Sequence, residues 1–436
     1  MATNAVDPGM GIRIRAGERQ WIGRGLSRCS PAVFAAWMAP WLALLGAGVY
    51  ATYLCLSQGL GVTNLDNRFG FGLWIFLDLA VIALGAGAFF SGFLLYIMKW
   101  KEIKAIISSA VVLGFLCYSG AVAVLAVDVG QPLRSWFTFW HPNVHSMLTE
   151  VTFCITCYLV VLTVEYTPII LKNRRLKQVP SCLVFEWELH KLIPVLAGIG
   201  CFLSFFHQGS LGGLFGVMRG RPFAFREGFA IWPSTFFLFV LSAAAVGPSF
   251  VILTTKLVEW ITSKRLVKAA VYHTLARTTG VLLTAYVALK SVDTLVWLNS
   301  TSASAGFAPW EYYSWKPFGG WILFAEIVVF GMIPALLLLS KRLRTRSGIV
   351  TAGALLACTG VVLNRFVMTI QTLALPTLSF DPFLTYMPNW VECAVFGMVI
   401  AYAVIVYSLS YRYLNLFPQE KEIAADIVEV ADVPVR

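Results

Sequence analysis

Residues 71–98, FGLWIFLDLAVIALGAGAFFSGFLLYIM, decide the fold class of this chain. This apolar run is long enough to cross a bilayer as a helix, and Asp78 is the only charged residue within it. A charged side chain in hydrocarbon costs several kcal/mol, roughly 2.5–3.5 even on the lenient insertion scale. We therefore expect Asp78 to face a polar cavity inside a helical bundle.

The rest of the chain has the same character. Of its 436 residues, 58% are hydrophobic and only 13% are charged, whereas a soluble domain carries about 25% charge. The sequence therefore predicts an all-α polytopic membrane protein with about ten transmembrane helices. The predicted spans are residues 31–57, 71–98, 105–127, 146–171, 189–207, 229–255, 268–292, 317–340, 347–371 and 390–414.

The net charge of +11 does not indicate nucleic-acid binding, because most of the Lys and Arg residues lie in short segments on one side of these spans. The positive-inside rule then places both termini in the cytoplasm and the protein in the inner (cytoplasmic) membrane. Residues 1–30 form a cytoplasmic N-terminal segment, and residues 416–436 form a cytoplasmic tail. The opposite loops carry Trp, Pro, Gly, His and Asn, which suits the docking of a partner protein.

A short internal repeat divides the membrane domain, residues 31–415. Gly70-Phe-Gly-Leu-Trp74 opens the second predicted span, and Gly228-Phe-Ala-Ile-Trp232 opens the sixth. The repeat predicts two four-helix bundles, residues 71–207 and 229–371, flanked by the first and last spans. Transporters with such repeats bind ligands between the repeated units.

Several ionisable side chains fall at one depth, within roughly 15 Å of the outer surface at 1.5 Å per helical residue. They are Asp78, His141, His145, Glu150, His207, Glu326, Arg365 and Glu392. Only Glu165 and Arg277 stand out in the inner half. A polar pocket open to the outer leaflet would use such groups to bond a carbonyl or hydroxyl ligand and to exchange its protons. The alternative is that Arg365 pairs with Glu326 or Glu392 and ties helices together.

Other motifs leave alternatives open. Residues 207–213, HQGSLGG, predict a glycine-rich break after the fifth span, either a plain turn or a close approach to a ligand. Cys154 and Cys157 lie in an apolar helix and are expected to be packing residues. Pairs of His are arithmetically able to hold two b-type haems, but none lies deep in a predicted span. We therefore expect no haem, iron–sulfur cluster or metal in this chain.

A set of ordered segments resembles one membrane-protein family. The segments are Gly72-Leu-Trp-Ile-Phe-Leu-Asp78, Asp128-Val-Gly130, His141-Pro-Asn-Val-His-Ser146 leading to Glu150, Val164-Glu-Tyr-Thr-Pro168, His207-Gln-Gly-Ser210, Glu326, Asn364-Arg365 and Tyr386-Met-Pro-Asn-Trp-Val-Glu392. Together they resemble the NrfD/PsrC polysulfide-reductase-like integral membrane subunit superfamily, in its ten-span HybB/DsrP/HmcC-type branch.

The resemblance implies a quinone-interacting subunit of a respiratory redox complex that is not catalytic alone. It implies electron exchange between menaquinone, or another quinone, and an extracytoplasmic ferredoxin-like iron–sulfur subunit, with proton uptake or release. A multihaem cytochrome c or a catalytic subunit would complete the complex, and a DsrP-like role in sulfur metabolism would fit. The implied quinone-binding residues are Asp78, His141, Asn143, Ser146, Glu150 and His207. The implied proton-path residues are Glu165, Glu326, Arg365 and Glu392.

The sequence leads to two further expectations, one about function and one about a partner. A secondary transporter, or a proton-translocating channel subunit without a redox role, is the alternative function. A basic strip of Arg219, Arg221 and Arg226 in the loop 208–228 would dock an acidic partner.

Overall fold

The computed structural model describes residues 20–424, apart from positions 24, 222, 230–231, 307, 309, 311–312, 314–318 and 375–383. Within these residues, ten helices are long and apolar enough to span a membrane. They run over Pro31–Gln58, Leu73–Ile97, Ile107–Asp128, Met147–Leu171, Lys191–Gly216, Ser234–Thr262, Ala269–Ser304, Gly320–Leu339, Ser347–Ala374 and Trp390–Tyr413. The prediction of an all-α polytopic membrane protein is confirmed.

Four of the ten described spans are built from more than one element, because short π-helical or kinked segments interrupt them. The first half of the chain contains α1 (Pro31–Gln58), η2 (Leu60–Val62), α2 (Leu73–Gly85), α3 (Gly87–Gly92), η3 (Phe93–Ile97), η4 (Lys101–Ala105), α4 (Ile107–Asp128), η5 (Pro132–Arg134), α5 (Phe137–Trp140), α6 (Met147–Leu171), η6 (Leu176–Gln178) and α7 (Pro180–Gly216).

The second half begins with a very short antiparallel pair of strands. Its elements are β1 (Gly228–Phe229), β2 (Trp232–Pro233), α8 (Ser234–Thr262), α9 (Ala269–Val296), η7 (Trp297–Thr301), α10 (Ser302–Ser304), α12 (Gly319–Phe324), η8 (Ala325–Met332), α13 (Ile333–Leu339), α14 (Lys341–Arg344), α15 (Ser347–Phe366), η9 (Val367–Gln371), α16 (Thr372–Ala374) and α17 (Trp390–Tyr413).

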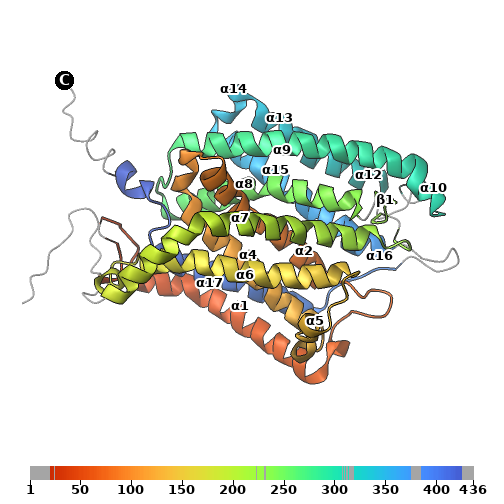
Figure 1. The fold of residues 1–436 in the computed structure, drawn as a ribbon, viewed down its shortest axis with the longest axis horizontal. Coiled ribbons are helices and arrows are strands. Elements are labelled where there is room, and N and C mark those ends of the chain that lie inside the picture. Colours follow the sequence, from red (N-terminus) through yellow and green to blue (C-terminus); the bar gives the residue numbers. More distant parts are fainter. Residues whose placement is uncertain are drawn as a thin grey trace, which may run out of the picture.

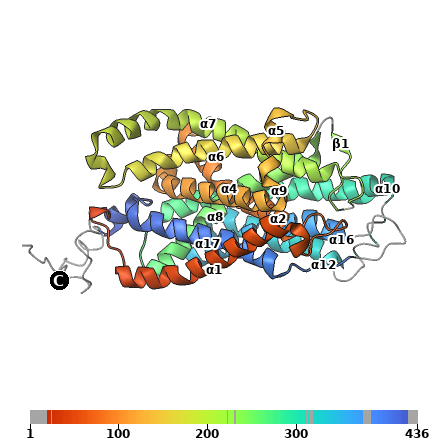
Figure 2. The same cartoon turned by 90° about the horizontal axis from the view of Figure 1, so that it is seen from below.

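The long helices lie side by side along the long axis of the molecule (Figure 1). Helices α2, α3, α4, α6 and α7 form one group of neighbours, and α8, α9, α13 and α15 form another. The two groups share an interface, because α8 packs against α2, α3 and α7. Helix α17 packs on α4, and α1 lies outside it, on the face opposite α7 (Figure 2). The division into two separate bundles stays a prediction.

Small residues hold the two groups close together. A Cβ atom added to Gly87 on α3 would lie only 2.7 Å from the carbonyl oxygen of Gly247 on α8. The core around this contact draws on both groups, including Ile82, Ala83 and Ala243. Such small-residue contacts let helix backbones approach closely, which is how membrane helices gain packing energy. The groups therefore form one packed body.

Both described ends of the chain lie at the same end of the molecule (Figure 1). Arg28 donates to Glu420 at 2.6 Å, and Asn173 donates to the carbonyl oxygens of Trp21 and Tyr413 at 2.9 and 2.8 Å. An even number of spans requires this arrangement, since each span carries the chain to the other side.

Helix α7 differs from the prediction. It continues without interruption to Gly216, so the predicted glycine-rich break at 207–213 is wrong. The glycines serve packing, because a Cβ atom on Gly209 or Gly212 would overlap the Phe236 ring or the start of α8. The fifth span is therefore longer than predicted, and His207 lies within it.

Candidate functional site

A cavity of about 490 Å³ opens among α2, α4, α5, α6 and α7. It is mainly apolar, with a few polar side chains on one part of its wall. Its lining consists of Phe71, Ile75, Asp78, Leu79, Leu125, Val129, Phe137, Thr138, His141, Asn143, Leu148, Thr149, Val151, Thr152, Leu211, Leu214 and Phe215. A concave apolar site with a few convergent polar groups is the usual form of a small-molecule site.

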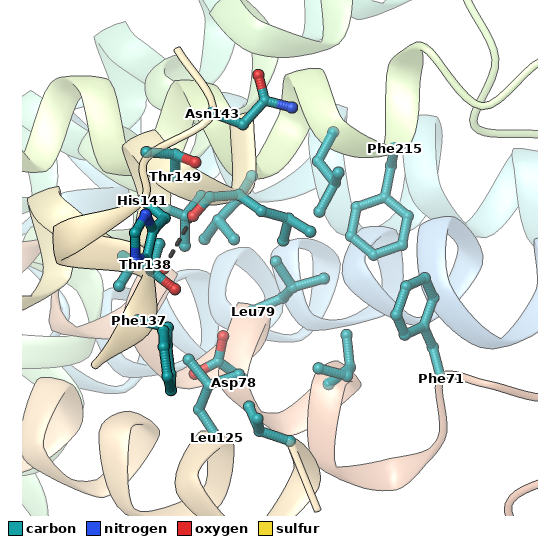
Figure 3. Close-up of a pocket in the computed structure, with 17 residues that line it drawn as sticks. Phe71, Asp78, Leu79, Leu125, Phe137, Thr138, His141, Asn143, Thr149 and Phe215 are labelled. Atoms are coloured by element: carbon teal, nitrogen blue, oxygen red, sulfur yellow. Dashed lines mark hydrogen bonds between the residues drawn. The ribbon is translucent and has the colours of Figure 1, made fainter. Parts of the chain in front are cut away.

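The polar part of the wall is built around Asp78 and His141, which reach into the same cavity (Figure 3). The Asp78 side chain is only 4% exposed, and its Oδ1 atom has no hydrogen-bond partner among the described residues. The His141 ring, at the end of α5, stacks on Phe137 with 6.0 Å between ring centroids. A buried carboxylate oxygen without a partner is costly, so a ligand that bonds to it would be strongly favoured.

The opposite part of the wall is aromatic. Phe71 and Phe215 meet edge to face with ring centroids 5.7 Å apart, and Figure 3 shows them away from Asp78 and His141. Leu79 lies between the two parts. A ligand with a polar, proton-exchanging head and a flat or chain-like apolar body therefore fits this cavity.

The predicted quinone-binding residues do not all reach the cavity. Asp78, His141 and Asn143 line it. Ser146 is the residue before the first turn of α6, and Glu150 is half-buried next to the lining residue Thr149, but neither lines the cavity.

His207 is fully buried behind the cavity, one turn before the lining residue Leu211, and its ring centroid lies 5.7 Å from that of Tyr118. The sequence reasoning missed Thr138, Thr149 and Thr152. Thr149 and Thr152 lie three residues apart on α6, a spacing that puts them on one helix face.

A buried polar cluster surrounds His207. The Tyr118 hydroxyl and the Ser204 hydroxyl lie 2.9 Å apart, and Gln208 donates to the carbonyl oxygen of Ile82 at 3.0 Å. Tyr158 stacks edge-on against Tyr118 at 4.5 Å, and its hydroxyl has no partner among the described residues. Glu165, two turns further along α6, is half-buried. These side chains form a polar strip from the cavity side of the first helix group toward the end of the molecule where the described termini lie.

The second helix group contains a buried network of charges. Glu326, in the π-helical segment η8, lies 3.5 Å from Lys290 and accepts a 2.6 Å hydrogen bond from Asn364. Asn364 in turn accepts a 2.7 Å hydrogen bond from Arg365. The predicted alternative, a direct pair between Arg365 and a carboxylate, is therefore replaced by a link through Asn364, and Lys290 is the cation that Glu326 contacts.

Arg365 is completely buried. It donates to the Ser242 hydroxyl at 2.9 Å and lies 3.6 Å above the Phe239 ring. Arg365 is linked to the Glu326 carboxylate through Asn364, so its hydrogen bonds and the face of the Phe239 ring provide much of its stabilisation. Arg365 lies in the last turn of α15, just before the π-helical segment η9, and such segments are frequent at functional sites.

The prediction of a basic docking strip is wrong for Arg226. Arg226 is 6% exposed and pairs with Asp293 at 3.0 Å, so it is not part of an exposed docking strip. The seventh span, which contains Lys290, is longer than predicted, because α9 and η7 extend it well beyond residue 292. The three-residue spacing of Lys290 and Asp293 places both on one helix face. That spacing was the signal that the helix continues.

Glu392 has a structural role at the start of α17. It completes a capping box with Asn389, and its Oε2 atom accepts from the backbone N–H groups of Asn64 and Asn389, each at 3.0 Å. The Tyr386 hydroxyl donates to its other oxygen. Burial and this contact raise the pKa of Tyr386, which keeps the phenol neutral as a donor. These bonds account for the burial of Glu392.

Comparison with known proteins agrees with this architecture. The family model described as polysulphide reductase, NrfD, matches residues 61–376. A menaquinone reductase integral membrane subunit from Nitratidesulfovibrio vulgaris is 50% identical over 92% of this chain and 96% of its own length.

More distant relatives come from other bacteria. A probable Ni/Fe-hydrogenase 2 b-type cytochrome subunit from Escherichia coli is 24% identical over 84% of this chain and 88% of its own length. A selenate reductase subunit from Mesobacillus selenatarsenatis is 23% identical over 86% of this chain and 93% of its own length. The breadth of the family match, together with ten packed spans, shows that this chain belongs to the NrfD polysulphide reductase family.

Proposed function

We propose that this chain is the quinone-binding membrane subunit of a respiratory redox complex, and that the quinone head group binds in the cavity beside Asp78 and His141. The observation that carries the proposal is the unpartnered Asp78 carboxylate at the polar side of an otherwise apolar cavity. The 50% identical relative is named a menaquinone reductase subunit, so we propose menaquinone as the substrate.

The side chains would act on protons rather than on electrons. Reduction of a quinone consumes two electrons and two protons, and oxidation of the quinol releases the same number. Asp78 and His141, which line the cavity, would hydrogen-bond the two head-group oxygens and exchange these protons. The aromatic part of the cavity would hold the apolar portion of the substrate and exclude water.

We propose that the electrons pass to or from an extracytoplasmic ferredoxin-like iron–sulfur subunit. The relatives named as subunits of a menaquinone reductase, a hydrogenase and a selenate reductase support a role within a larger complex. The cavity lies at the end of the molecule away from the described termini (Figure 1), where α5 and the loops around it would meet such a partner. The excess of positive charge at the other end supports termini in the cytoplasm and residence in the inner membrane.

The proton path is proposed along the buried polar residues. Glu165 follows the polar strip beside Tyr118 and Tyr158, whereas Glu326 and Arg365 belong to the charged network of the second helix group. Glu392 is the weakest of the four proposed residues, because its capping contacts already give it a structural role.

The test uses the assembled complex with a menaquinol analogue. We expect Asp78→Asn to abolish most quinone-linked turnover while the complex stays assembled. Unchanged turnover in that variant would contradict the proposed site.

A proton-translocating role without redox chemistry is the second candidate, and the buried network of Lys290, Glu326 and Arg365 is what favours it. Proteoliposomes that hold this chain alone separate the two functions. Proton or solute uptake without a redox partner would support the second candidate.

A further inference from the structure

At the end of the second helix group that is away from the cavity beside Asp78, two arginines lie together without a carboxylate. Arg344, the last residue of α14, donates to the carbonyl oxygen of His273 on α9 at 3.4 Å. Arg277 lies one helical turn after His273 and therefore on the same face of α9. Neither arginine forms an ion pair with any described residue.

Packing of the helices fixes this position. A Cβ atom on Gly280 would lie 2.9 Å from the backbone of Leu338 and Leu339, so α9 and the end of α13 touch backbone to backbone. Since the two helices run in opposite directions, Arg277, just before Gly280, lies beside the turn from α13 into α14. Arg344 on α14 then folds back toward α9, and α14 lies next to the first half of α9 (Figure 1).

The two side chains differ in environment. Arg344 is only 8% exposed, and its Nε atom is buried without a hydrogen-bond partner among the described residues. Burial, and then the nearby Arg277 guanidinium, lower the pKa of Arg344. Arg277 is exposed although it lies within a membrane-spanning helix, about 12 Å from the helix start at 1.5 Å per residue. An exposed arginine at this depth is unfavourable unless it reaches a polar partner.

The surface next to this pair is apolar. Val281, one turn after Arg277, is 52% exposed, and Leu336 on the neighbouring α13 is 63% exposed. The exposed cations Lys341, Arg342 and Arg346 add to the positive charge around the pair. Two guanidinium groups above an apolar helix surface match a phosphate with acyl chains attached to it. Arg is well suited to this contact, because its planar group bonds two phosphate oxygens at once.

We propose that Arg277 and Arg344 bind the phosphate of an anionic phospholipid whose acyl chains lie along α9 and α13. The phosphate would supply the negative charge that the pair lacks and an acceptor for the free Arg344 Nε atom. Basic pockets between membrane helices bind anionic head groups in this way. The site is independent of the quinone cavity, which lies near the other end of the molecule, so a failure of one proposal does not affect the other.

The test compares variants of the full chain in phosphatidylcholine nanodiscs with and without phosphatidylglycerol. Arg277→Gln removes the exposed cation with little effect on folding, and Arg265→Gln is the matched control, since Arg265 is an exposed cation on the loop before α9. We expect native mass spectrometry to show phosphatidylglycerol retained by the wild type and the control, and roughly tenfold weaker retention by Arg277→Gln.

Three outcomes would overturn the proposal. Equal retention of phosphatidylglycerol by Arg277→Gln and Arg265→Gln would show that this pair holds no lipid. Equal retention of phosphatidylcholine and phosphatidylglycerol by the wild type would remove the need for an anionic head group. A thermal stabilisation by inorganic phosphate as large as that by phosphatidylglycerol would identify the ligand as a free anion.

Discussion

The most informative perturbation is Asp78→Asn, which removes the carboxylate from the cavity among α2, α4, α5, α6 and α7 at nearly constant volume. The side chain is 4% exposed, and Oδ1 accepts no hydrogen bond from the described residues, so its free oxygen is available to a ligand. Loss of a charge-assisted hydrogen bond weakens binding by about 1.5–3 kcal/mol. Loss of a proton-transfer group lowers the rate by a further factor of roughly 10²–10⁴.

We therefore expect Asp78→Asn to raise KM for a menaquinol analogue at least roughly tenfold and to lower kcat by about two orders of magnitude or more. The assay is steady-state turnover of the purified complex, with assembly followed by size-exclusion chromatography. Glu102→Gln is the matched control, since it makes the same chemical change at an exposed site outside the cavity. Wild-type kcat and KM in an assembled Asp78→Asn complex would refute the reasoning.

Four further outcomes can be measured. His141→Gln lowers quinone-linked turnover roughly tenfold or more, whereas His145→Gln leaves it unchanged, because of these two residues only His141 lines the cavity. Equal effects of the two variants in turnover assays would contradict this prediction. Glu326→Gln lowers the unfolding free energy by about 3–5 kcal/mol, because it leaves Lys290 buried without its ion-pair partner. Adding Lys290→Met restores much of this loss, as measured by thermal unfolding. No recovery in the double variant would argue against the ion pair. Glu392→Ala destabilises the protein by about 2–4 kcal/mol, because it removes the capping box of α17. The measurement is the Tm of the variant, and an unchanged Tm would be inconsistent with the cap. The subunit purified alone gives no b-haem bands in a reduced-minus-oxidised spectrum, and paired haem bands would refute the expectation that it holds no haem.

The fold was largely predictable because hydropathy reports directly on the ten spans. The errors came from glycine and from charge. The glycine-rich sequence of residues 207–213 predicts a break because glycine weakens helices in water, whereas in a membrane the same glycines let α7 pack against α8. The three Arg residues of the loop 208–228 predict an exposed basic strip, whereas Arg226 is buried and pairs with Asp293, 67 residues away in the sequence.

The candidate site was predictable only in part. Asp78 stands out in the sequence because a lone carboxylate in a membrane-spanning segment is energetically costly and therefore indicates a functional site. The pairing of Arg226 with Asp293, and the link from Arg365 through Asn364 to Glu326, join residues that are far apart in the sequence. No local pattern shows which distant charges meet, and the aromatic wall of Phe71 and Phe215 depends on packing for the same reason.

The most direct test of quinone binding in the cavity beside Asp78 and His141 is photo-crosslinking with a photoreactive menaquinone analogue, mapped by mass spectrometry. The account predicts crosslinks to the cavity-lining stretches of α2, α6 and α7, around Asp78, Thr149 and Leu211, that excess menaquinone removes by competition. Competed crosslinks confined to the second helix group, with none at these three positions, would contradict it.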